Sequence, residues 1–90
     1  MSNVFLVTYD LMIPGQKYDA IYERIKFLGD YIHFQDSVWI VKTNLSAKSV
    51  FEQLEPAIDK GDKILVINVT NQYWGWSDTD KWENLARMFY

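Results

Sequence analysis

Two stretches of the chain are apolar at nearly every position. They are NVFLVTY (residues 3–9) and KILVINVT (residues 63–70), and both are rich in β-branched residues. This composition is typical of strands that are covered on both faces. We therefore expect two buried strands, one at the start of the chain and one after its middle.

In a third stretch, apolar and polar residues alternate. In YIHFQ (residues 31–35), the Ile and Phe side chains fall on one face of a strand, while Tyr, His and Gln fall on the other. Asp36 and Ser37 are turn-forming residues, and VWIVKT (residues 38–43) follows them. The pattern predicts a β-hairpin.

Helical spacing of apolar residues begins after a turn at Pro14 and Gly15. Gly29 stands where a C-terminal stop is expected. The spacing therefore predicts a first helix that ends before Gly29. Its apolar face consists of Tyr18, Ile21, Tyr22, Ile25 and Leu28.

Two further stretches have the same spacing. Ser46 is placed to cap a second helix, whose last turn should kink or restart at Pro56. Ser77 is placed to cap a short third helix in the tail. The apolar faces are Ala47, Val50, Phe51, Leu54 and Ile58 in the second helix, and Trp82, Leu85, Ala86 and Phe89 in the third.

The predicted order is β-α-β-β-α-β plus a helical tail, which indicates an α+β, ferredoxin-like sandwich. We assign residues 1–72 to the ferredoxin-like domain and residues 73–90 to a Trp-rich tail that packs on the domain or on a dimer partner. Right-handed crossovers place both domain helices on one face of the sheet. The second face must be covered by the tail or by a second copy. We favour a homodimer, because a chain of 90 residues has little stability to spare.

The charge of the chain limits its partners. Nine Lys and Arg against twelve Asp and Glu give a net charge of −3, so the summed field repels nucleic-acid phosphates at long range. The basic residues are scattered singly, and binding of RNA or DNA would need a local patch. The N-terminus lacks the features of a signal peptide, and no apolar run approaches the roughly 20 residues that span a bilayer. We expect a cytoplasmic protein that does not enter a membrane.

The chain offers few groups for catalysis. It has one His and no Cys, which excludes disulfides, thiolate zinc sites and Cys–His pairs within one chain. His33 is interpreted as a structural residue. Asp10 remains, because it ends the first strand beside a loop, where working groups are common. It either caps the strand end through local hydrogen bonds, or it pairs with Asp10 of a second copy to share Mg²⁺ or Mn²⁺ and activate water.

Several aromatic residues are candidates for stacking on nucleobases. Tyr18 and Tyr22 share the helix face that meets the sheet, so we interpret them as packing residues. Tyr9, Trp74 and Trp76 are the binding candidates. The two Trp residues stand either side of Gly75 without periodicity, which favours an interface with protein or nucleic acid.

Much of the chain resembles a known family. The segments that carry the resemblance are VTYDL (7–11), PGQKYDAIYERIKFLG (14–29), SVWIVKT (37–43), LSAKSVFEQL (45–54) and GDKILVINV (61–69). They resemble the small proteins grouped around the CRISPR-associated protein Cas-two, in particular its SinR-like branch. The resemblance implies a ferredoxin-like homodimer. It also implies that Asp10 corresponds to the aspartate that is the family's proposed metal ligand, in a nuclease site at the dimer two-fold.

Two functions stay open at this point. In adaptation complexes, the family member is a non-catalytic bridge that binds DNA, whereas fold relatives include virulence-associated endoribonucleases. The first hypothesis is a metal-dependent endonuclease of RNA or DNA that uses Asp10 from both subunits. The second, which the acidic composition favours, is a dimeric, nucleic-acid-associated binding or assembly module without catalytic groups.

Overall fold

The computed structural model describes residues 2–12 and 18–90. The predicted turn at Pro14 and Gly15 lies outside this range. The order of elements is the predicted one, with a short 3₁₀-helix, η1, added after α2. The elements are β1 (Asn3–Asp10), α1 (Tyr18–Lys26), β2 (Asp30–Gln35), β3 (Val38–Thr43), α2 (Ala47–Leu54), η1 (Glu55–Ala57), β4 (Lys63–Val69) and α3 (Thr79–Arg87).

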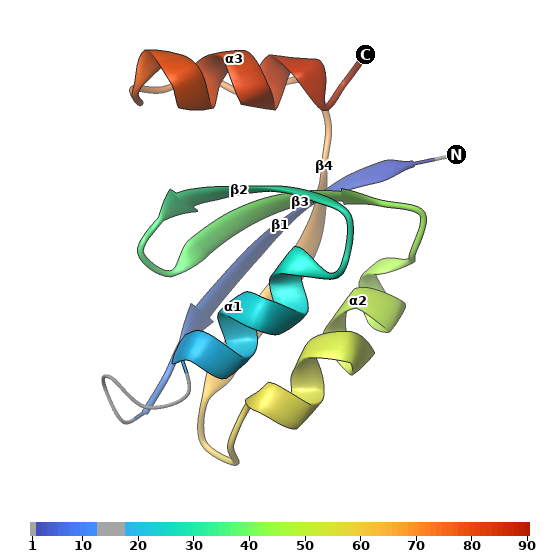
Figure 1. Ribbon diagram of the computed structural model, residues 1–90, viewed down its shortest axis with the longest axis vertical. Coiled ribbons are helices and arrows are strands. Elements are labelled where there is room, and N and C mark those ends of the chain that lie inside the picture. Colours follow the sequence, from blue (N-terminus) through green and yellow to red (C-terminus); the bar gives the residue numbers. More distant parts are fainter. Residues whose placement is uncertain (1, 13–17) are drawn as a thin grey trace.

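The four strands form one antiparallel sheet in the order β2-β3-β1-β4. β1 lies inside the sheet between β3 and β4, so its backbone is paired on both edges. Figure 1 shows α1 and α2 together on one face of the sheet and α3 on the other. The chain is therefore a small α+β protein in which the sheet lies between the helices α1 and α2 on one face and α3 on the other.

The larger core lies between the sheet and the helices α1 and α2. β1 contributes every second residue to it, namely Phe5, Val7 and Tyr9. Ile21 and Ile25 of α1 and Val50 and Leu54 of α2 are fully buried against these side chains. The face predicted for the first helix is confirmed, and that of the second is confirmed except for Phe51, which does not belong to this core. The partly buried members that pack on the core are Tyr18, Tyr22, Leu28, Ala47 and Ile58.

A smaller core lies on the opposite face, beneath α3. Leu85 of α3 and Met88, the residue that caps it, are buried on Val4, Ile32 and Ile40 of the sheet. Nζ of Lys81 also donates a hydrogen bond of 3.2 Å to the carbonyl of Phe34, which ties α3 to β2. The tail therefore covers part of the second face, one of the two covers that the sequence left open.

The caps of α2 follow the sequence. Oγ of Ser46 accepts a hydrogen bond of 3.1 Å from the amide of Ser49, and Pro56 is the second residue of the short 3₁₀-helix η1, where a restart was expected. The prediction that Ser77 caps α3 is wrong. The N-cap residue is Asp78, whose carbonyl accepts the first helical hydrogen bond, from the amide of Trp82 at 3.0 Å. Either residue type suits a cap, so the sequence carries no signal that separates these two neighbours.

Gly29 joins α1 to β2 and gives a test of this packing. Its φ of 154° is one that other residues rarely adopt, and a Cβ there would overlap the carbonyl oxygen of Lys42. This oxygen belongs to the backbone of β3, so relieving the overlap would require the strand itself to shift. We expect Gly29→Ala to lower the free energy of unfolding by about 2 kcal/mol or more, measured by urea denaturation.

Gly75 provides the matched control. A Cβ at Gly75 would meet no atom within 4 Å. We expect Gly75→Ala to change the free energy of unfolding by less than about 0.5 kcal/mol. Equal effects of the two substitutions would contradict the close approach of Gly29 to β3.

Candidate functional site

Asp10 is the last residue of β1, and it is exposed. Asp10 and Val4 are an even number of residues apart on the strand, so the Asp10 side chain lies on the same face as Val4, the face that carries α3. In the register of the sheet, Asp10 stands opposite Lys63, the first residue of β4. The carboxylate therefore shares the end of the sheet with one positive charge.

Asp10 does not belong to a cluster of metal-ligating side chains among the described residues. Among residues 2–12 and 18–90, no three His, Asp or Glu side chains come together in a way that could hold a metal ion. The carboxylate of Asp62, in the turn before β4, accepts hydrogen bonds from the amides of Met12 at 2.6 Å and Asp59 at 2.9 Å.

Part of the second face of the sheet is left open beside Asp10. Leu65 and Ile67 of β4 are 55% and 48% exposed. They pair in register with Thr8 and Leu6 of β1, and these four residues form what we call the β1/β4 strip. Asp10 and Lys63 stand at one end of the strip, and β4 is the edge of the sheet. The strip is an apolar surface that α3 does not cover.

Tyr9 lies on the other face of β1, within the larger core, and is only 4% exposed. Its Oη accepts a hydrogen bond of 3.0 Å from Nε1 of Trp39 and donates one of 3.4 Å to the carbonyl of Asp36. Burial raises the pKa of the Tyr9 phenol above its usual range. A base cannot stack on a buried ring, so in this arrangement Tyr9 supports the hairpin and does not present a binding face.

His33 is held by packing. Its ring stacks on Trp39 at a centroid distance of 4.0 Å and an angle of 9°, and Tyr22 meets it edge-on at 5.0 Å. Nε2 of His33 lies 3.1 Å from the carbonyl of Asp36, which also accepts from Tyr9. Since a carbonyl only accepts, this nitrogen carries the proton. The arrangement agrees with the structural interpretation of His33.

Trp74 and Trp76 lie in the irregular segment between β4 and α3. Their side chains are 100% and 97% exposed. Tyr73 anchors the segment by stacking on Trp82 at 5.4 Å and on Phe89 at 5.9 Å. A groove of about 450 Å³ lies between the segment and α3, lined by Asn71, Tyr73, Trp74, Gly75 and Trp82. We call it the aromatic groove.

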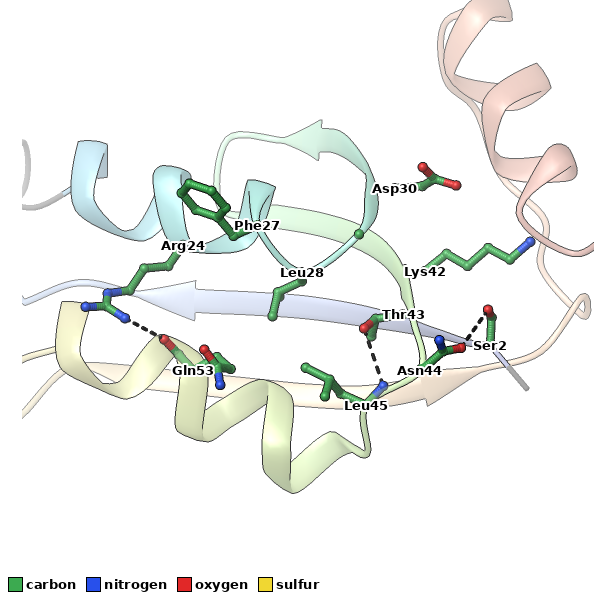
Figure 2. Close-up of a pocket in the computed structure, with 11 residues that line it drawn as sticks. Ser2, Arg24, Phe27, Leu28, Asp30, Lys42, Thr43, Asn44, Leu45 and Gln53 are labelled. Atoms are coloured by element: carbon green, nitrogen blue, oxygen red, sulfur yellow. Dashed lines mark hydrogen bonds between the residues drawn. The ribbon is translucent and has the colours of Figure 1, made fainter.

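A second hollow, which the sequence did not indicate, lies where β1 begins and β3 ends (Figure 2). It has a volume of about 700 Å³. Arg24 and Lys42 stand at its opposite ends, and each is already engaged: Nη1 of Arg24 donates to the carbonyl of Gln53 at 3.1 Å, and Nζ of Lys42 to that of Tyr90 at 3.4 Å. The two positive charges do not converge on one ligand.

The chain matches no protein-family model, and a search of curated proteins finds no significant match. Within the part of the chain that the structure describes, no helix has the length and apolar character needed to cross a bilayer.

The hydrogen bond between Tyr9 and Trp39 gives the second prediction. Tyr9→Phe leaves the buried indole N–H of Trp39 without its acceptor, and we expect the free energy of unfolding at pH 8 to fall by about 1–3 kcal/mol. Since the pKa of Tyr9 is raised on folding, the unfolded chain loses this proton first. The contribution of neutral Tyr9 is complete below about pH 10 and is lost as the pH rises above it.

The difference between wild type and Tyr9→Phe should therefore shrink by up to about 1.4 kcal/mol between pH 10 and pH 11. Urea denaturation of both proteins at pH 8, 10 and 11 measures it. Comparing the two proteins cancels the titration of the other side chains. A difference that stays constant up to pH 11 would contradict the burial of Tyr9.

Proposed function

We propose that the chain is a ferredoxin-like, homodimeric module of the Cas-two-like kind, which binds or assembles with nucleic acid or protein and has no catalytic centre of its own. The strand order β2-β3-β1-β4 with antiparallel neighbours supports the ferredoxin-like arrangement. The observation that carries the homodimer is the β1/β4 strip, which leaves Leu65 and Ile67 in solvent.

The edge position of β4 adds to this argument. β4 pairs only with β1 in the described sheet, and between Lys63 and Val69 it has no charged residue and no proline. Long apolar edge strands tend to pair or to be covered. A two-fold contact between two strips covers both apolar surfaces at once. It also leaves the aromatic groove, which involves none of the four residues of the strip, available to a partner.

The alternative function is a metal-dependent endonuclease, and the position of Asp10 favours it. Asp10 lies on the face that carries the strip and at the end of the strip, so a two-fold contact there can bring two Asp10 carboxylates together. Such a pair has the oxygen ligands that Mg²⁺ and Mn²⁺ prefer, and the bound ion would supply an activated water. Lys63, opposite Asp10, would offset the charge of a phosphate. We rank this function second, because one carboxylate per chain makes a sparse site.

The homodimer predicts a specific effect of charge in the strip. We expect the wild-type chain of 10.7 kDa to have the mass of a dimer in sedimentation equilibrium. Leu65→Asp places an unpaired carboxylate in the contact, which costs about 3 kcal/mol or more. It should therefore raise the dimer dissociation constant by about 100-fold or more.

Phe27→Asp is the matched control. Phe27 follows α1, is 87% exposed and lies outside the strip, so its replacement should leave the dissociation constant unchanged. Circular dichroism checks that both variants keep the fold. A monomeric wild type, or a Leu65→Asp dimer as tight as the wild type, would contradict this interface.

The endonuclease predicts that cleavage depends on Asp10. Labelled single-stranded RNA and duplex DNA are incubated with the protein in Mg²⁺, in Mn²⁺ or in chelator. If the alternative function holds, cleavage requires the metal and falls to background in Asp10→Asn. Asp30→Asn is the control, because Asp30 is also exposed and also stands opposite a lysine, Lys42, at another corner of the sheet.

The two functions give different outcomes in this assay. A wild-type dimer that cleaves neither substrate supports the module. Cleavage that Asp10→Asn and Asp30→Asn leave equally intact counts against Asp10 as a ligand.

A further inference from the structure

The aromatic groove has features that packing within the chain does not explain. Within the part of the chain that the structure describes, Tyr73 and Trp82 stack on each other, while Trp74 and Trp76 make no ring contact. Two fully exposed indoles on one short segment expose a large apolar area, and such patches mark interaction sites. The volume of about 450 Å³ falls within the usual range of ligand-binding pockets, and aromatic walls are common in such pockets.

Indole N–H groups line the groove, and its other polar side chains, Asn71 and Tyr73, can both donate and accept. The indole N–H groups of Trp74, Trp76 and Trp82 make no hydrogen bond to any described residue, and an indole can only donate. A ligand that pairs with these indole N–H groups therefore presents carbonyl oxygens. A proline-rich segment in the polyproline II conformation has this property, because its carbonyls point to solvent and proline has no N–H.

The charge beside the groove also selects among ligands. Asp78 and Asp80, at the start of α3, are exposed. The basic side chains of α3 are engaged within it or with the sheet. Lys81 lies 3.9 Å from Asp78 and bonds the carbonyl of Phe34, and Arg87 donates to Oδ1 of Asn84 at 2.8 Å. Two carboxylates against one lysine give the start of α3 a net negative charge, which disfavours a phosphate backbone and favours a ligand with a basic residue.

From these features we propose that the aromatic groove binds a proline-rich segment of a partner protein, with an arginine or lysine beside the prolines. Aromatic grooves with donor side chains recognise the rigid polyproline II helix at a low entropic cost. A second copy of this chain cannot supply the segment, because its two prolines, Pro14 and Pro56, lie far apart in the sequence. The inference rests on the proposed binding function and narrows its partner to a protein.

The test is a fluorescence titration of the full chain with a synthetic peptide of eight prolines between two arginines. The reference peptide replaces the prolines by alternating glycine and alanine. We expect a blue shift of the indole emission with the proline peptide and none with the reference. Trp74→Ala and Trp76→Ala should each weaken binding by about fivefold or more. Phe27→Ala, which removes an equally exposed ring elsewhere, should leave binding unchanged.

The other occupants are outcomes of the same experiment. Equal signals from the two peptides, or loss of binding in Phe27→Ala, overturn the proposal. So does tighter binding of a ten-nucleotide oligothymidylate than of the proline peptide, or a change of oligomeric mass in Trp74→Ala. Each measurement is made beside sedimentation equilibrium. A monomer that still binds the proline peptide would refute the homodimer and leave this inference standing.

Discussion

Strand β1 is paired on both edges and carries apolar residues on both faces, so the other elements are arranged to cover it. Phe5, Val7 and Tyr9 point to the helices α1 and α2, and Val4 points to α3. Covering both faces requires more than the two helices that the β-α-β crossovers provide. The tail after β4 supplies the additional helix, and the layout of exposed and buried surface follows from how far that helix reaches.

α3 is a helix of nine residues, and it covers only part of its face. Its buried residue Leu85 and the C-cap residue Met88 lie on Ile32 of β2, Ile40 of β3 and Val4 of β1. The β4 side of the face stays open, which leaves the β1/β4 strip with Asp10 at its end. The apolar strip and Asp10 are both exposed because α3 does not cover this side of the face. The proposed dimer across the strip would therefore also decide whether two Asp10 carboxylates can meet.

The sequence predicts the elements well because periodicity and caps are local signals. It predicts the packing of His33, Tyr18 and Tyr22 because their alternation or spacing assigns them to a face. Tyr9 could have been assigned in the same way, since it is in phase with the buried Phe5 and Val7. The choice between Ser77 and Asp78 as the cap of α3 could not be made, because both residue types cap helices and the two are neighbours in the sequence. How much of the second face the tail covers depends on tertiary contacts that no local pattern encodes.

The two open surfaces differ in charge, and this difference bears on what each can bind. The strip ends in Asp10 opposite Lys63, a neutral combination that suits a self-complementary contact between copies. The aromatic groove lies beside the start of α3, where the exposed carboxylates of Asp78 and Asp80 outnumber the one lysine, Lys81. An acidic aromatic surface repels phosphates and attracts cationic peptides. If the family resemblance to DNA-binding bridges holds for this chain, its nucleic acid must therefore contact a surface other than the groove. The seven Lys and Arg residues outside α3 are scattered singly along the sequence, so such a surface would have to gather them from several elements.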